Sequence, residues 1–152
     1  MENKFKHILL ADDDKDHAFL FQTILKKLHP EKSLDAVYDG EDLFQYLSTD
    51  KPDLIFLDLN MPCKNGIECL NEIKSNPAYR HIPVIVYSSS AQLDDIQQSY
   101  IHQADFYVVK PFSVKHLEHA LTNIFSLDWN AGSPINQHYY INNRFVPFTS
   151  AG

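Results

Sequence analysis

The chain alternates short apolar runs with stretches in which apolar residues recur every three to four positions. A short apolar run favours a buried strand, and a recurrence near 3.6 residues favours an amphipathic helix. The strands expected in this way are 7–11, 34–38, 53–59, 83–88 and 105–110. Each is followed by a helical pattern, within 18–28, 43–47, 67–73, 93–100 and 114–125. The pattern therefore predicts five successive βα units.

Strands that are apolar on both faces and separated by helices are typical of a parallel sheet covered on both sides. Right-handed crossovers then place helices on the two faces. We expect an α/β fold with a doubly wound five-stranded parallel sheet, in three layers. One domain should span residues 1–126.

The helical period stops after Phe125, and the tail at 127–152 combines Asn, Ser, Pro and Gly with aromatic residues. The aromatic residues of the tail are Trp129, Tyr139, Tyr140, Phe145 and Phe148. Apolar runs flank Asn142-Asn143, and Asn tolerates positive φ, so a two-residue hairpin is one interpretation. An irregular tail packed on the domain is an equal alternative. In either case no separate domain is expected there.

Composition and charge exclude several classes of protein. The 152 residues are 44% hydrophobic with a net charge of -7, which disfavours direct binding to nucleic acid. The apolar runs are far shorter than the roughly 20 residues that span a bilayer, so we expect a cytoplasmic protein without membrane contact. The four glycines do not form a nucleotide-binding motif. Cys63 and Cys69 lack the spacing of a zinc site and are interpreted as reduced thiols.

Polar residues follow four of the expected strands. Asp12 to Asp14 follow the first strand, Asp58 ends the third, Ser88 ends the fourth and Lys110 ends the fifth. The carboxyl ends of parallel strands meet at one edge of a sheet, where ligands bind. Clustered carboxylates repel one another, and a hard cation such as Mg²⁺ relieves that repulsion while keeping several of its waters. The sequence therefore predicts a Mg²⁺ site at this edge.

Each polar group also has a purely structural interpretation. Asp14 or Asp16 could cap the first helix, and Ser88 to Ser90 could cap the fourth. Lys110 could be an isolated surface charge. Asp58 is harder to explain in this way, because an unpaired carboxylate beside a buried strand is costly. The combination of all of these groups at strand ends favours a functional site.

Four motifs resemble one known family. ILLADDD, IFLDLNMPCKNG, PVIVYSSS and ADFYVVKPF occur in the order and near the spacing seen in receiver domains of two-component response regulators. The resemblance covers residues 5–126 and is closest to the single-domain, phytochrome-associated branch. It implies a flavodoxin-like (βα)5 fold.

The resemblance also implies a role for individual residues. Asp58 would accept a phosphoryl group from a phosphohistidine, and Lys110 would contact that group. Mg²⁺ would be held by Asp12, Asp13, Asp58 and the backbone carbonyl of Asn60. Ser88 would be the switch hydroxyl and Tyr107 the switch aromatic residue, and Lys110-Pro111 would be a cis peptide. A sensor histidine kinase or phosphotransfer protein would be the donor.

Two residues depart from the family pattern. Gln103 stands where the family usually has Gly, which could alter the loop before the fifth strand. Ser90, two residues beyond the switch Ser88, is small and uncharged, and with Asn60 it could change how fast water reaches the phosphoryl group.

Two other functions compete with this interpretation. A haloacid-dehalogenase-type phosphohydrolase needs D-x-D-x-[TV], whereas residues 12–16 read D-D-D-K-D. A receiver-like module that works without phosphorylation usually lacks an acidic residue or the lysine, and none is missing here. We therefore expect a phosphoacceptor that loses its own phosphoryl group to water, rather than a turnover enzyme. Because no output domain follows, output should be non-covalent, with a homodimer formed by the helix 4–strand 5–helix 5 face and the tail.

Overall fold

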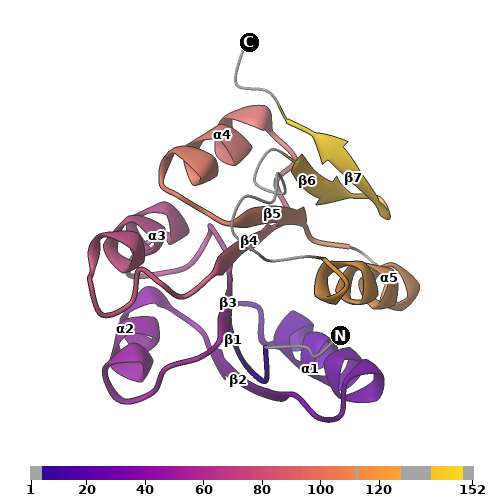
Figure 1. Ribbon diagram of the computed structural model, residues 1–152, viewed down its shortest axis with the longest axis horizontal. Coiled ribbons are helices and arrows are strands. Elements are labelled where there is room, and N and C mark those ends of the chain that lie inside the picture. The colour runs from indigo at the N-terminus through magenta and orange to yellow at the C-terminus, as the bar shows by residue number, and fades with distance from the viewer. Residues whose placement is uncertain (1–4, 112, 128–137, 149–152) are drawn as a thin grey trace.

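The computed structural model describes residues 5–111, 113–127 and 138–148 (Figure 1). Five βα units come first, as expected. The strands are β1 (His7–Ala11), β2 (Ser33–Val37), β3 (Leu54–Leu57), β4 (Val84–Ser88) and β5 (Phe106–Val109), followed by β6 (His138–Ile141) and β7 (Arg144–Pro147). The helices are α1 (Lys15–Leu28), α2 (Gly40–Thr49), α3 (Gly66–Ser75), α4 (Leu93–Ile101) and α5 (Val114–Phe125).

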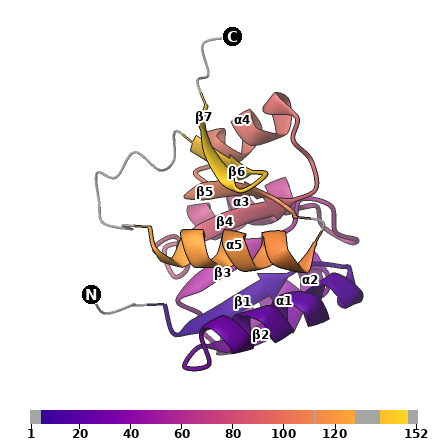
Figure 2. The ribbon, with the colours of Figure 1, turned by 90° about the vertical axis from the view of Figure 1, so that its right-hand side faces the viewer.

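The sheet contains the five parallel strands expected and two more. Its order is β2-β1-β3-β4-β5-β6-β7, and every neighbouring pair is parallel except β6 with β7. The first five strands form the doubly wound parallel sheet, which confirms the fold class. A C-terminal hairpin extends this sheet beyond β5 (Figure 2). The sequence did not predict that the tail would add strands to the sheet of the domain.

The hairpin turns at two asparagines. Asn142 and Asn143 have φ of 51° and 66°, the left-handed values that a two-residue turn between antiparallel strands requires. The hairpin interpretation is therefore confirmed over 138–148, and the irregular tail is wrong there. Trp129 lies outside the described residues.

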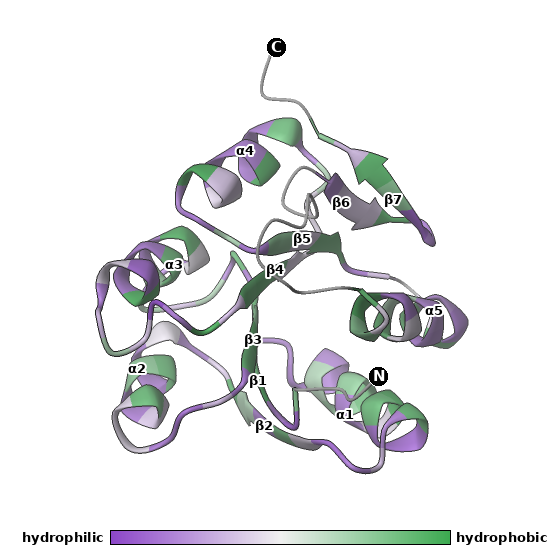
Figure 3. Ribbon diagram, in the orientation of Figure 1, coloured by the Kyte–Doolittle hydropathy of each residue, from purple (hydrophilic) through white to green (hydrophobic). Residues whose placement is uncertain are grey.

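Two apolar layers separate the sheet from its helices. Helices α2, α3 and α4 cover one face, and α1 and α5 cover the other (Figure 1). Alternate residues of each strand enter opposite layers: Leu9 packs toward the first group of helices, and Ile8 and Leu10 toward the second. The apolar sides of the helices turn toward the sheet (Figure 3). Burial on both faces explains why the strands are apolar runs rather than alternating sequences.

Helix caps fix where several helices begin. The side chain of Asp14 accepts a hydrogen bond from the backbone N–H of His17, so Asp14 caps α1 as one interpretation proposed. The serines after β4 do not cap α4, because the residue before that helix is Gln92. Among the described helices, none combines the length and the apolar composition needed to cross a bilayer.

Candidate functional site

Three carboxylates meet at the carboxyl edge of the sheet. Asp12 and Asp13 follow β1, and Asp58 follows the neighbouring strand β3. One oxygen from each lies within 4.8 Å of the others. Asp12 and Asp58 are buried, whereas Asp13 is exposed. The parallel pairing of β1 with β3 therefore produces the acidic cluster that the sequence predicted.

The two oxygens of Asp12 have different surroundings. Oδ1 accepts a hydrogen bond from the backbone N–H of Asp14 at 3.0 Å. Oδ2 is buried and lies 2.8 Å from Lys110 Nζ as an ion pair, and beyond this contact it has no hydrogen-bond partner among the described residues. Since a buried charged oxygen is costly without full coordination, Oδ2 is suited to bind a cation.

Lys110 lies between the two buried carboxylates. Its Nζ is 2.8 Å from Asp12 Oδ2 and 3.3 Å from Asp58 Oδ2, and its side chain is only 13% exposed. Burial by itself would lower the pKa of Lys110, but the two carboxylates outweigh burial and raise that pKa. The ammonium group is therefore charged at neutral pH and directed at Asp58.

Asp58 is 4% exposed and forms few hydrogen bonds. Its Oδ1 accepts from the backbone N–H of Asn60 at 3.2 Å, and its Oδ2 accepts from Lys110. Burial raises the pKa of Asp58 to about 6, and the charge of Asp12 adds to this rise while Lys110 opposes it. A carboxylate that is desolvated but ionised near neutral pH can act as a nucleophile.

The donor set fits a hard divalent cation. It consists of carboxylate oxygens around an incompletely coordinated buried oxygen, with Asp13 open to solvent. Mg²⁺ and Mn²⁺ prefer such oxygen ligands and keep some of their waters. A divalent metal site is therefore supported at this edge. The position of the Asn60 carbonyl relative to it stays a prediction.

Ser88 and Tyr107 belong to the neighbouring strands β4 and β5. Both are fully buried. Ser88 Oγ accepts from the backbone N–H of Ser90 at 3.1 Å, and the hydroxyl of Tyr107 donates to the Ser90 carbonyl at 2.8 Å. The structure thus joins the two expected switch residues through one residue, Ser90. The Ser90 hydroxyl also contacts Asp95 in the first turn of α4 at 2.5 Å.

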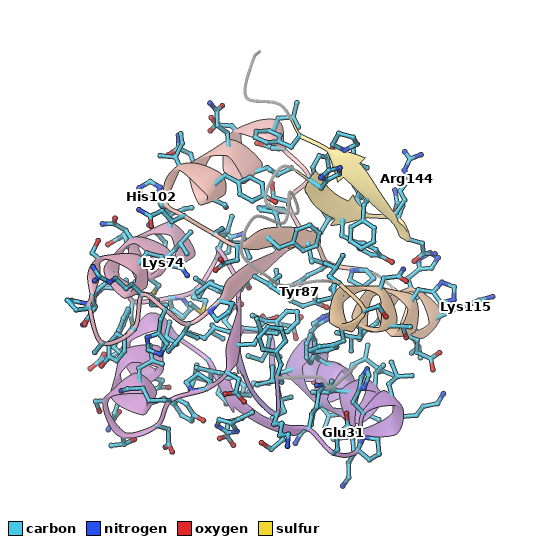
Figure 4. The ribbon with its side chains drawn as sticks, in the orientation of Figure 1. Glu31, Lys74, Tyr87, His102, Lys115 and Arg144 are labelled. Carbon is cyan, nitrogen blue, oxygen red and sulfur yellow. The ribbon has the colours of Figure 1, made fainter. Side chains whose placement is uncertain are left out.

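Sequence reasoning missed Tyr87 and His17. The Tyr87 ring is fully buried, and its centroid is 5.7 Å from Lys110 Nζ. Its hydroxyl lies 2.6 Å from His17 Nε2 on α1. Figure 4 shows Tyr87 in the interior, on the side of the sheet that α1 and α5 cover. The sequence signal for Tyr87 was weak because it lies in an apolar run and resembles an ordinary core residue.

The Lys110–Pro111 peptide differs from expectation. Within the residues that the structure describes, no peptide bond is cis, so the expected cis peptide is wrong. The trans form is favoured for most bonds before proline, and Lys110 reaches both carboxylates with this geometry.

The chain matches known proteins over most of its length. A family model described as the response regulator receiver domain matches residues 8–122. Response regulator Rcp1 of Synechocystis sp. is 37% identical over 122 residues, which are 76% of this chain and 83% of that protein. Chemotaxis protein CheY of Pseudomonas aeruginosa is 28% identical over 118 residues, covering 78% of this chain and 94% of that protein.

Solved structures agree. The phosphorylated cyanobacterial phytochrome response regulator RcpA superposes with a TM-score of 0.74 at 36% identity, covering 79% of this chain and 91% of that one. The Mn²⁺-bound form of Rcp1 gives a TM-score of 0.73 at 34% identity, covering 86% and 98%. Together with the acidic cluster, Ser88, Tyr107 and Lys110, these similarities show that the chain belongs to the response regulator receiver domain family.

Proposed function

We propose that Asp58 accepts a phosphoryl group from the phosphohistidine of a sensor kinase or phosphotransfer protein. The observation that carries this proposal is the position of Asp58, buried within 4.8 Å of two further carboxylates and 3.3 Å from Lys110. This geometry distinguishes Asp12 and Asp58 from the exposed carboxylates. Of these two, Asp58 is the one that the resemblance in IFLDLNMP assigns as the acceptor.

The reaction is an in-line displacement. An oxygen of Asp58 attacks phosphorus, an O–P bond forms, and the P–N bond to the donor imidazole breaks. The electron pair returns to that imidazole, which takes a proton. Lys110 offsets negative charge on the transferred oxygens, and its position is fixed by Asp12. The Ser88 hydroxyl then has a new acceptor at the phosphoryl group.

Mg²⁺ is the cation we propose for this site, held by Asp12, Asp13, Asp58 and the Asn60 carbonyl. It would supply positive charge that lets an anionic donor approach the carboxylates. The chain acts as a phosphoacceptor that loses its phosphoryl group slowly to water, not as a turnover enzyme. Output passes to partners that bind the surface of the chain. One such partner is a second copy of the chain, bound on the side of α4 and the C-terminal hairpin.

The test is uptake of phosphate from acetyl phosphate, followed by intact mass. With Mg²⁺ the chain should gain one adduct of about 80 Da, and in EDTA it should gain almost none. Asp58→Asn should abolish the adduct. Asp94→Asn is the matched control, because Asp94 is an exposed carboxylate on α4 and should leave uptake unchanged.

An adduct that persists in Asp58→Asn would refute the assignment of the acceptor. Equal labelling with and without metal would refute the role of the acidic cluster. A chain that takes up no phosphoryl group under any condition would instead be an interaction module that works without phosphorylation.

A further inference from the structure

The C-terminal hairpin covers the outer edge of β5, the strand that contains the expected switch residue Tyr107. Strand β6 pairs with β5 in parallel, with Tyr107 opposite Tyr139 and Val108 opposite Tyr140. The hairpin lies between α4 and α5 at the end of the sheet (Figure 1). The surface next to the switch is therefore already occupied by a segment of the same chain.

The hairpin is held on both sides of the sheet. Toward α4, the hydroxyl of Tyr100 donates to the His138 carbonyl, and the Tyr100 ring packs 5.8 Å from that of Phe148. Toward α5, Asn123 Nδ2 donates to the Tyr140 hydroxyl at 3.1 Å. Side-chain bonds to both helices, in addition to the strand pairing, indicate a specific docking site.

A continuous set of contacts leads from the hairpin to the site. Tyr139 packs against the same apolar layer that buries Tyr107. The hydroxyl of Tyr107 holds the Ser90 carbonyl, and the Ser90 N–H is bonded to Ser88 Oγ. Tyr107 is wholly buried, and its neighbour on β6 is Tyr139, so the hairpin belongs to the packing that restricts movement of the Tyr107 ring.

The turn of the hairpin also reaches the loops of the site. Asn142 and Asn143 line a cavity of about 210 Å³ together with Ser89, Ala91, Lys110 and Pro111. These last four residues belong to the loops that follow β4 and β5. The hairpin turn therefore shares this cavity with both loops whose residues would surround a phosphoryl group on Asp58.

We propose that the β6–β7 hairpin is a built-in ligand of the switch surface, and that its docking and phosphorylation of Asp58 favour each other. This inference rests on the proposed function. A docked hairpin restricts Tyr107, which holds the Ser90 peptide and so restricts the segment that follows Ser88 and is bonded to its hydroxyl. Because that restriction is already in place, less conformational entropy is lost when Ser88 binds a phosphoryl group. The coupling is reciprocal, as in any linked equilibrium.

The first measurement is hydrogen exchange on the full chain, with and without Mg²⁺ and beryllofluoride as a stable substitute for the phosphoryl group. Backbone amides of 138–148 should exchange at least about fivefold more slowly when beryllofluoride is bound, the lower end of usual coupling between two sites. An unchanged or faster exchange of the hairpin would overturn the inference.

The second measurement is the reverse effect. Tyr100→Phe removes the hydroxyl that holds the His138 carbonyl but keeps the ring, and Tyr139→Ala removes a packed side chain from β6. Each should weaken beryllofluoride binding at least about fivefold relative to the intact chain. Tyr79→Phe is the control, because Tyr79 lies between α3 and the start of β4, with Lys51 over its ring, and should bind normally.

The two proposals fail in different ways. If the unaltered chain binds beryllofluoride but its hairpin exchange and the two hairpin variants show no change, phosphorylation stands and the coupling is wrong. If the unaltered chain binds no beryllofluoride and takes up no phosphoryl group, both proposals fall.

Discussion

Asp58 shows how one buried carboxylate can be costly to the fold and useful to the site. Its folded pKa of about 6 lies above the ordinary value of 3.8, chiefly because of burial. The folded chain therefore binds a proton at Asp58 more tightly than the unfolded chain does. The stability contributed by that proton is present at low pH and is lost as pH rises from about 4 to 6.

The upward direction of this pKa shift gives a prediction for Asp58→Asn in EDTA. Asn resembles the protonated carboxyl, so the free energy of unfolding of the variant should rise relative to the unaltered chain as pH increases from about 4 to about 7. The relative gain should reach about 1 to 3 kcal/mol. Urea unfolding at a series of pH values measures it. A difference that is independent of pH would contradict the raised pKa.

Gln103 is a second residue whose local chemistry is measurable. It has φ of 73°, a left-handed conformation that side chains other than Gly adopt only at a cost. The resemblance implies Gly at this position, and the positive φ is the reason that Gly would suit it. Gln103→Gly should raise the free energy of unfolding by about 0.5 to 1 kcal/mol, whereas Gln103→Ala should not. Thermal unfolding of both variants shows whether a gain in stability comes from relief of backbone strain or from loss of the Gln103 side chain.

Most of the site could be predicted residue by residue, because its groups follow separate apolar runs. The three carboxylates and Lys110 meet as expected. Tyr87 and His17 could not be foreseen, since their contact depends on the distance between β4 and α1. The cis form of Lys110–Pro111 came from resemblance alone and is wrong.

At the scale of elements, the start of α3 controls the backbone that carries Asp58. Gly66 begins α3, and its N–H donates to the Leu59 carbonyl at 2.9 Å. A Cβ at this position would lie 2.3 Å from the Asp58 carbonyl oxygen and 2.5 Å from Leu59 Cα. Both neighbours are backbone atoms that cannot rotate away, so the helix and the strand end approach closely only with Gly.

Gly66→Ala should therefore lower the free energy of unfolding by about 1 to 3 kcal/mol, the usual range for overpacking. It should also slow phosphoryl uptake, because relief of the clash displaces Asp58. Asn71→Ala, on the exposed side of the same helix, is the control and should change neither quantity. Urea unfolding together with intact-mass kinetics measures both effects. Normal uptake in a destabilised Gly66→Ala chain would contradict the link to Asp58.

The hairpin marks the limit of sequence reasoning at this scale. Asn142-Asn143 indicated where it could turn, and the turn has the expected positive φ values. The sequence could not indicate that β6 joins β5 in parallel, because this pairing depends on an edge strand already exposed in the folded domain. The five βα units were predictable since each rests on a local period.

At the scale of the whole molecule, the hairpin changes which surface a second copy can use. The outer edge of β5, part of the dimer face expected from sequence, is paired with β6. The new edge strand β7 carries Arg144 and ends at Pro147, two features that discourage strand-to-strand association. Exposed apolar side chains remain on both faces beside the hairpin: Leu93 and Ile101 lie on α4, and Phe145 of β7 packs against Phe106 and Tyr140 on the side of α5.

A dimer should therefore form through side chains on α4 and the hairpin rather than by extension of the sheet. We expect the full chain to associate at about 100 μM, where an interface of ~5.5 kcal/mol is half occupied. A chain ending at Leu127 should associate less, and so should Ile101→Ser, which alters α4 alone. Phe19→Ser is the control, because Phe19 is at least as exposed as Ile101 but lies on α1. Light scattering with and without phosphorylation measures the mass, and a strictly monomeric full chain in both states would leave a monomeric receiver with its own hairpin docked beside the switch.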